Sequence, residues 1–251
     1  NTTRIFHIAF AAIFVTSPYF FLTLYETLGV PFILASLLAI IFTSFLSLGI
    51  EIVIYQPLIK RSRSANVAMV SSIGAMIIII NSIALFYGNE TKIFDFGMTS
   101  SLMIGNTLFT NIQIAQFLVS LVIMGAFFGL LRYSKFGITT RALRDDEQLC
   151  KIMGVNIKHV RFVLFLLSGS LAAIGSLMIA WDVGMNPYAG MPILLNVVVA
   201  IILGGIGRFD AAVIGGFIIG VIQAMAVWAF SSRWQDAITF GLLISVLAFR
   251  N

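Results

Sequence analysis

Apolar runs separated by short polar intervals account for most of the chain. These runs are continuous and do not alternate between apolar and polar positions, as the strands of a membrane barrel do. Backbone N–H and C=O groups inside a bilayer must be paired within the chain, so long apolar runs predict membrane helices. The runs cover residues 5–24, 30–55, 67–87, 112–131, 160–181, 193–206, 211–230 and 237–249. We therefore expect an all-α, polytopic transmembrane helix bundle with about eight membrane segments of about 20 residues each.

The run at 193–206 is shorter than most of the others. A helix rises about 1.5 Å per residue, whereas the hydrocarbon core of a bilayer is about 30 Å thick. We therefore expect this run to be a tilted, locally thinned or re-entrant segment.

Composition excludes a water-soluble domain. Hydrophobic residues make up 60% of the 251 residues, charged residues only 10%, and the mean hydropathy is +1.05. Soluble domains carry about 25% charged residues, because charge keeps a folded surface in water. We expect a single transmembrane domain over residues 1–251, surrounded by lipid. The basic residues lie between apolar runs and not on a basic domain, which excludes nucleic acid as a partner.

The basic residues are distributed unequally between alternate polar intervals. If the interval 56–66 is cytoplasmic, thirteen of the fifteen Lys and Arg residues lie in the cytoplasm, and only Lys92 and Arg233 lie outside. Loops rich in Lys and Arg remain on the cytoplasmic side of a membrane. The same count favours a single crossing by 193–206, since a return to the outer side would place Arg208 outside.

Residues 132–161 form the longest hydrophilic interval. Spacings of three, four and seven place four apolar residues near one helical face, namely Ala142, Leu149, Ile152 and Met153. Thr139 or Thr140 is positioned to cap the start of this helix, and Gly154 to end it. We expect a short amphipathic helix, a glycine stop, and a second helix that enters the membrane. The segment is either a charged loop that only solvates one face or a docking helix for a cytoplasmic partner.

The same interval resembles a known family. Residues 140–146 (Thr-Arg-Ala-Leu-Arg-Asp-Asp) and 152–156 (Ile-Met-Gly-Val-Asn) are similar to the cytoplasmic loop of permeases of the branched-chain amino-acid ABC transporter family. In that family the loop carries a degenerate coupling motif, with an Arg-Ala start and a Leu-Gly-Ile-Asn-like end. Cys150 replaces the small Ala that is usual before this end.

Two further stretches extend the resemblance over nearly the whole chain. Tyr-Gln-Pro-Leu at 55–58, preceded by Glu51, resembles the family's Tyr-Arg-Pro-Leu-Arg after a span. Leu-Gly-Gly-Ile-Gly at 203–207, with later glycines, resembles the family's C-terminal glycine-rich signature. Phe10 and Ala11 depart from the family, which commonly has a His and a Gly there. The family usually has earlier helices and continues beyond the last residue, so we expect a chain that is shortened at both ends or that belongs to a divergent branch.

The resemblance implies the permease subunit of an ATP-driven importer for branched-chain or related amino acids, with an amide or urea permease of the same family as the alternative. It further implies a homologous second permease subunit, two cytoplasmic ATPase subunits, an extracytoplasmic solute-binding protein and a place in the bacterial inner membrane. The sequence has no G-x-x-x-x-G-K-[ST] loop and no His and Cys cluster with metal-ligand spacing. We therefore expect no enzyme activity, metal or cofactor in this chain, and we expect the partner ATPases to bind ATP and Mg²⁺.

The candidate site residues fall into two sets. The ATPase-coupling set, implied by the resemblance, consists of Arg141, Ala142, Arg144, Asp145, Leu149, Met153 and Gly154. The second set lines a translocation path or packs helices together, and it consists of Asn81, Asn196, Gly204, Gly205, Gly207, Gly215 and Gly216. Amides inside apolar runs, Gln223 among them, either bond helices to one another or line a substrate path. Glycines either let helices approach closely or mark an unwound segment.

Glu51 lies inside the second apolar run, where a charge is costly. We expect it to reach the interface or to pair with a nearby Arg, and a proton relay is the alternative. A self-sufficient secondary transporter or channel is the rival class, which calls for ion-coupling intramembrane charges and an internal repeat. A structural scaffold explains the hydrophobicity but leaves the interval 132–161 unexplained.

Overall fold

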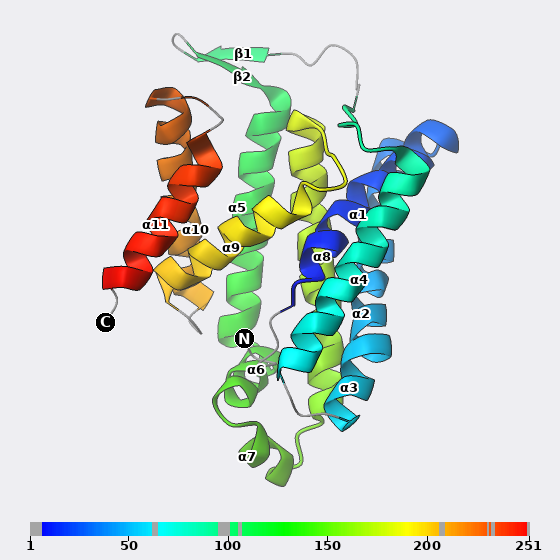
Figure 1. Ribbon diagram of the computed structural model, residues 1–251, viewed down its shortest axis with the longest axis vertical. Helices are drawn as coiled ribbons and strands as arrows, with labels where there is room; N and C mark the ends of the chain where they lie inside the picture. Colours follow the sequence, from blue (N-terminus) through cyan, green and yellow to red (C-terminus); the bar gives the residue numbers. More distant parts are fainter. Residues whose placement is uncertain are drawn as a thin grey trace. The chain divides into compact units, whose positions relative to one another are not determined.

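The computed structural model describes residues 7–61, 65–94, 101–104, 107–205, 209–229, 231 and 234–249. The chain forms two compact units, made of residues 2–190 and 191–251, and Figure 1 labels the helices and strands of both. Both units consist mainly of apolar helices, as the continuous apolar runs predict.

The first unit contains most of the membrane helices and the hydrophilic interval. Its elements are α1 (Phe10–Leu22), the π-helical turn η1 (Thr23–Thr27), α2 (Phe32–Ile50), the π-helical turn η2 (Glu51–Tyr55), α3 (Gln56–Arg61), α4 (Ala65–Tyr87), the strands β1 (Ser101–Ile104) and β2 (Thr107–Thr110), α5 (Asn111–Tyr133), α6 (Lys135–Asp145), α7 (Glu147–Ile152) and α8 (Ile157–Val183). α2, η2 and the start of α3 form one continuous apolar segment.

Five helical segments of the described residues are long and apolar enough to cross a membrane. They are Phe32–Leu58, Asn66–Tyr87, Asn111–Tyr133, Ile157–Val183 and Ala211–Ala229. α9 (Gly190–Gly204) is a shorter apolar helix of 15 residues, as the short run at 193–206 predicts. The prediction of a polytopic helix bundle that includes one short segment is therefore confirmed. Full crossing by α9 stays a prediction.

A small hairpin precedes α5, in the interval between the apolar runs 67–87 and 112–131 where the sequence predicts no membrane segment. β1 and β2 are antiparallel, with Ser101 opposite Thr110 and Ile104 opposite Thr107. Thr110 then caps α5, because its hydroxyl accepts a hydrogen bond from the N–H of Gln113 at 3.3 Å. The hairpin therefore leads directly into a well-capped membrane helix.

Helices α1, α2 and α8 form the core of the first unit, and α4 packs on α1. A methyl group at Gly169 of α8 would lie 2.7 Å from Cβ of Ser47 and 2.9 Å from Cα of Ser44, both on α2. The hydroxyl of Ser47 donates to the carbonyl oxygen of Phe165 at 2.9 Å. Small residues at this contact let the two helix backbones approach closely.

The second unit contains α9, apart from its first residue, with α10 (Phe209–Ala229) and α11 (Gln235–Phe249). A side chain at Gly215 would collide with the carbonyl oxygen of Ala200, and one at Gly204 with that of Ala211. Ile219 of α10 is buried in the same apolar cluster as Ala200 of α9. Gly204 and Gly215 therefore act here as close-packing residues between α9 and α10.

Candidate functional site

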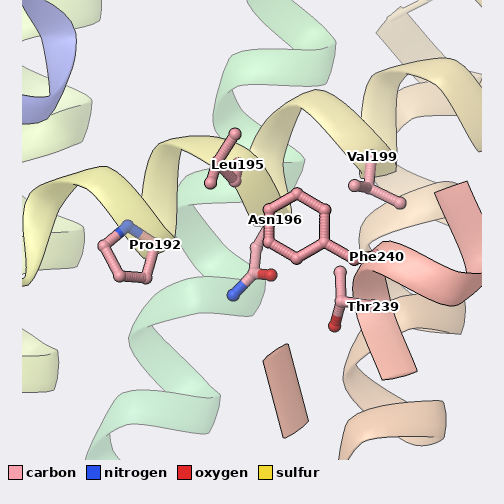
Figure 2. Close-up of a pocket in the computed structure, with 6 residues that line it drawn as sticks. All are labelled: Pro192, Leu195, Asn196, Val199, Thr239 and Phe240. Carbon is pink, nitrogen blue, oxygen red and sulfur yellow. The ribbon is translucent and has the colours of Figure 1, made fainter. Parts of the chain in front are cut away.

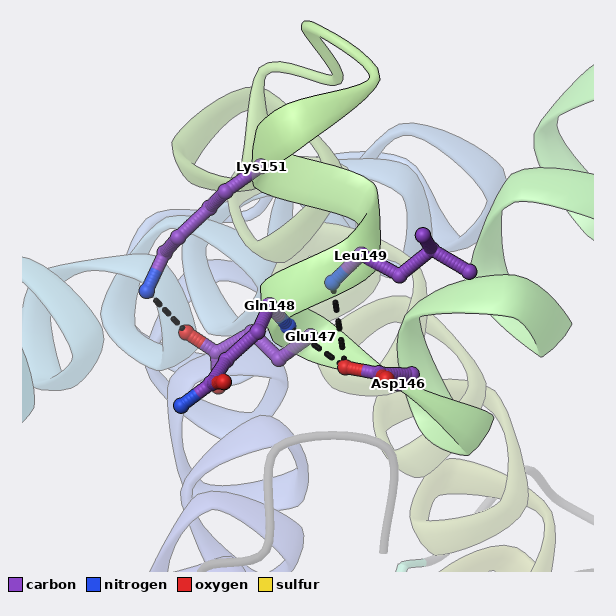
Figure 3. A network of polar contacts seen from close by, with 5 residues as sticks. All are labelled: Asp146, Glu147, Gln148, Leu149 and Lys151. Carbon is purple, nitrogen blue, oxygen red and sulfur yellow. Dashed lines mark hydrogen bonds and ion pairs between the residues drawn. The ribbon is translucent and has the colours of Figure 1, made fainter.

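The hydrophilic interval 132–161 contains two short helices, α6 and α7, instead of the single amphipathic helix that its apolar spacing predicts. The break lies at Asp146, whose backbone is extended (φ −148°, ψ 106°). Its carboxylate accepts hydrogen bonds from the backbone N–H groups of Gln148 at 2.8 Å and Leu149 at 3.0 Å (Figure 3). Aspartate is favoured at a helix start, where it satisfies free N–H groups, over a helix interior. This local cap explains why the predicted helix is divided.

α6 begins earlier than predicted, and a different residue caps it. The hydroxyl of Ser134 accepts a hydrogen bond from the N–H of Gly137 at 3.0 Å. Thr139 and Thr140 lie inside the helix, where each hydroxyl donates to the carbonyl oxygen four residues earlier at 2.9 Å. The prediction that one of these threonines caps the helix is therefore wrong.

Gly154 ends α7, as predicted. Its φ of +78° is a left-handed conformation that other residues adopt at a cost. The N–H of Gly154 donates to the carbonyl oxygen of Lys151 at 3.1 Å, and the N–H of Val155 donates to that of Cys150 at 3.0 Å. This pair of bonds is the Schellman motif, which satisfies the last carbonyl groups of a helix.

One side of α6 and α7 is packed against the start of α8. Leu143, Cys150 and Val160 are buried together, and Phe136, Val155, Ile157 and Leu164 pack against them. Val160 and Leu164 belong to α8, so this cluster attaches both short helices to a membrane helix. Cys150, where the resemblance implies a small Ala, is one of the three buried residues of the cluster.

The other side of α7 exposes large apolar side chains. Leu149 is 53% exposed, Ile152 83% and Met153 75%. We call these three residues the α7 face. Ala142 is exposed as well, but it lies on α6, beyond the break at Asp146. The structure therefore retains an exposed apolar surface in the hydrophilic interval, shorter than the stripe that the sequence predicts.

The charged residues of the predicted coupling set have partners within the chain. Arg141 donates a hydrogen bond to the carbonyl oxygen of Leu131, near the end of α5. Arg144 and Asp145 form an ion pair at 2.8 Å, in which the Asp145 side chain is 65% exposed. Arg141 therefore anchors α6 to α5, while Asp145 remains accessible at the surface.

A buried ion pair joins η2, the turn that follows α2, to α8 beside this segment. The Glu51 side chain is completely buried, and the Arg161 side chain is 12% exposed. Arg161 Nε lies 2.7 Å from Glu51 Oε1, and Nη2 lies 3.0 Å from Oε2. Two parallel hydrogen bonds of this kind fix both orientation and charge. Glu51 therefore pairs with an Arg, as expected, but this Arg lies 110 positions away in the chain and not in the adjacent basic interval.

Neighbouring residues of α8 contact the short helices α6 and α7 on the one hand and Glu51 on the other. Val160 is buried in the cluster that holds α6 and α7, and Arg161 pairs with Glu51 of η2. One turn further on, Phe165 accepts the hydrogen bond from Ser47 of α2. The first turns of α8 therefore contact both the short helices and the segment formed by α2 and η2. The sequence indicates Glu51 by its charge, but no local signal identifies Arg161 as its partner.

The predicted amides occupy different surroundings. Asn81 is exposed on α4, and its amide donates to the carbonyl oxygen of Ile77 in the same helix at 2.8 Å. Gln223 of α10 donates to the hydroxyl of Thr239 of α11 at 2.8 Å, so it bonds two helices together. Asn196 of α9 lines a pocket.

The remaining glycines of the second set have distinct local roles. Gly205 has a φ of +103° directly after α9 and is therefore suited to a turn there. Gly216 is exposed on α10, with nothing within 4 Å of the position of a side chain. Gly207 lies outside the described residues.

The pocket lies in the second unit between α9 and α11, is partly open and has a volume of about 60 Å³. Its lining residues are Pro192, Leu195, Asn196, Val199, Thr239 and Phe240 (Figure 2). Four of these six side chains are apolar, and none is charged. Thr239 and Phe240 have no signal in the sequence that predicts their place beside Asn196. Among the described residues, no group of three His, Cys, Asp or Glu side chains is placed to hold a metal ion.

Known proteins are similar to this chain over most of its length. A family model described as "Branched-chain amino acid transport system / permease component" matches residues 1–247. The high-affinity branched-chain amino acid transport system permease protein BraD of Pseudomonas aeruginosa is 29% identical over 218 residues, which are 84% of this chain and 70% of that protein. The corresponding protein LivH of Salmonella typhimurium is 30% identical over 215 residues, or 83% of this chain and 69% of that protein.

A more distant relative comes from an archaeon. The probable branched-chain amino acid transport permease protein LivH of Methanocaldococcus jannaschii is 27% identical over 201 residues, which are 76% of this chain and 62% of that protein. No solved structure matches the chain.

Proposed function

Because the chain belongs to the family of branched-chain amino acid transport system permeases, we propose that it is the membrane-spanning subunit of an ATP-driven importer for branched-chain or related amino acids. The names of its relatives from Pseudomonas and Salmonella support this substrate class. The multi-pass helices and the basic polar intervals support an inner-membrane location with those intervals in the cytoplasm.

The α7 face is the observation that carries the proposal. Apolar side chains exposed to lipid need no explanation in a membrane protein, but Leu149, Ile152 and Met153 belong to the most hydrophilic interval of the chain. Exposed apolar side chains on a short helix, beside charged ones, suit a groove on another protein. We assign this face to an ATPase subunit, which supplies the ATP hydrolysis for which the chain has no P-loop.

The importer proposed here contains further partners. A homologous second permease subunit completes the path, two ATPase subunits bind on the cytoplasmic side, and a solute-binding protein delivers the amino acid on the outer side. Each ATPase binds ATP and Mg²⁺, and this chain supplies the docking surface and half of the path.

Coupling follows from the connection between the α7 face and the bundle. A movement of α7 displaces Val160 through the buried cluster, and the Arg161–Glu51 pair passes this movement to α2. Allosteric coupling needs an element that both sites displace, and α8 has that position. The same pair satisfies the Glu51 carboxylate, which disfavours a proton relay and the secondary transporter that such a relay would serve.

Co-purification tests the docking role. The permease is expressed together with the ATPase subunits proposed as its partners, and Leu149→Asp and Met153→Asp are each expected to lower ATPase recovery about tenfold or more, as at a binding hot spot. Ile138→Asp is the matched control, because Ile138 is 56% exposed on α6 and outside the α7 face. Full recovery of ATPase with both Asp variants would exclude α7 as the docking site.

A further inference from the structure

The pocket between α9 and α11 presents hydrogen-bonding groups at an otherwise apolar wall. Asn196 comes from α9 and Thr239 from α11. In Figure 2 the Asn196 amide and the Thr239 hydroxyl both lie below the Phe240 ring. Charged groups are absent from the lining residues, so any ligand held here is recognised by hydrogen bonds and apolar contact.

The hydrogen bonds around Thr239 turn its hydroxyl into an acceptor. Thr239 Oγ1 donates its proton to the carbonyl oxygen of Gln235 at 3.0 Å. It also accepts a hydrogen bond from Gln223 Nε2 at 2.8 Å, and Gln235 Nε2 donates to Gln223 Oε1 at 3.2 Å. A hydroxyl has one proton and two lone pairs. These two bonds engage the proton and one lone pair of the Thr239 hydroxyl. The remaining lone pair can accept one further hydrogen bond, so toward a ligand Thr239 acts only as an acceptor.

Asn196 complements this acceptor. Its side-chain amide carries two N–H donors and an acceptor oxygen, and it forms no hydrogen bond with another described residue. The wall that joins the two polar groups consists of Leu195, Val199 and Phe240. The pocket therefore offers an acceptor at Thr239, donors and an acceptor at Asn196, and an apolar surface beside them.

An aliphatic α-amino acid has the matching groups. Its ammonium donates to Thr239 and to the oxygen of Asn196, its carboxylate accepts from Nδ2 of Asn196, and its aliphatic side chain lies on the apolar wall. The ammonium and the carboxylate of the amino acid are opposite charges that compensate each other, whereas a basic or acidic side chain would add a further charge that the lining does not compensate. Binding without an ion pair is weak, which suits a transport path, because a solute must leave such a site again.

We propose that the pocket lined by Asn196, Thr239 and Phe240 is a contact site for the α-amino acid on its way through the bundle, an inference that rests on the proposed function. In this site Thr239 contacts the ammonium of the solute, Asn196 contacts both its ammonium and its carboxylate, and Phe240 and Leu195 contact its side chain.

Uptake kinetics in the reconstituted importer test this site. The complete complex, with its ATPases and binding protein, is placed in proteoliposomes with ATP, and uptake of radiolabelled leucine is measured. Asn196→Leu and Thr239→Val keep the side-chain size and remove the hydrogen bonds. Each is expected to raise the KM for leucine about tenfold, as the loss of a polar contact does in a substrate site. Thr239→Ser retains the hydroxyl and is expected to restore the wild-type KM.

Asn81→Leu is the matched control, because Asn81 is also an amide in an apolar helix but bonds only to its own helix. It is expected to leave the KM unchanged. Wild-type KM values in both Asn196→Leu and Thr239→Val would overturn the site and leave the importer intact. Absence of any ATP-dependent amino-acid uptake by the wild-type complex would instead overturn the proposed function, and the site with it.

Chemical protection provides a readout that does not depend on transport rate. Leu195→Cys is made together with Cys150→Ala, so that the pocket carries the one cysteine of the permease. Leucine is expected to slow modification of the introduced cysteine by a thiol reagent, and lysine to leave the rate of modification unchanged. An equal rate with and without leucine would overturn the site even where a variant of Asn196 fails to assemble.

Discussion

The guanidinium of Arg161 forms two hydrogen bonds with the carboxylate of Glu51, although the two residues are 110 positions apart in the chain. The pair is buried between α8 and the end of α2. It lies directly beside Val160, which belongs to the cluster that holds α6 and α7. The residue of α8 that packs against α6 and α7 and the residue of α8 that forms the buried ion pair are therefore adjacent in the chain.

Removal of one partner of this pair is expected to destabilise the permease strongly. Arg161→Met leaves the Glu51 carboxylate buried without a counter-charge, which costs about 3–5 kcal/mol in the free energy of unfolding. The double variant Glu51→Leu, Arg161→Met removes both charges and is expected to recover most of this loss. The thermal unfolding midpoint in detergent measures both effects. A double variant as unstable as Arg161→Met would contradict the account of the pair.

The same double variant separates coupling from stability. If the pair passes movement from α7 to α2, the folded double variant is expected to hydrolyse ATP while it transports less solute for each ATP. A coupling free energy of about 1–3 kcal/mol corresponds to about fivefold or more. The ratio of leucine uptake to phosphate release in proteoliposomes measures it. An unchanged ratio would reduce the pair to a structural role.

The cap at Asp146 is expected to control the docking helix. Asp146→Ala removes the two hydrogen bonds to the start of α7 and costs about 1 kcal/mol, as loss of an N-cap does. This corresponds to about a fivefold weaker ATPase affinity if only the ordered helix binds. Glu147→Gln is the control, since it removes only the exposed ion pair with Lys151 at 2.8 Å (Figure 3). Binding of purified ATPase to both variants decides whether the cap matters.

Substitution of Gly154 is expected to destabilise the permease because of the backbone conformation at this position. Gly154→Ala places a side chain at a φ of +78°, which costs about 1–2 kcal/mol in a left-handed conformation. Gly129→Ala is the comparison, because Gly129 lies inside α5 with nothing within 4 Å of the new methyl group. Alanine there is expected to leave the unfolding midpoint equal or raise it. Equal losses at both positions would argue against the backbone explanation.

The sequence predicts the membrane helices and the glycine stop well, because both depend on local chemistry. A continuous apolar run has few alternatives to a helix in lipid, and Gly154 provides the positive φ that a helix end needs. The prediction of one amphipathic helix, where the structure has two, is wrong for an equally local reason. The spacing of the apolar residues predicts one continuous helix. The Asp146 carboxylate instead accepts hydrogen bonds from two backbone N–H groups at the start of a new helix.

Contacts between distant segments are beyond the sequence alone. Glu51 is identifiable as a costly charge, but its partner Arg161 lies on a helix that only tertiary packing brings close. Asn196 is identifiable as an amide in an apolar run, whereas Thr239 becomes notable only beside it. In both cases periodicity and composition locate one residue, and the fold supplies the other.

Cross-linking in the assembled importer tests the central claim, that the ATPases dock on the α7 face. Met153→Cys is combined with Cys150→Ala, and a cysteine-to-lysine cross-linker is added to the complex in membranes. The account predicts a cross-linked product that contains the permease and an ATPase subunit, and much less product from Ile138→Cys on α6. An importer that takes up leucine with ATP but gives no ATPase cross-link at position 153 would contradict it.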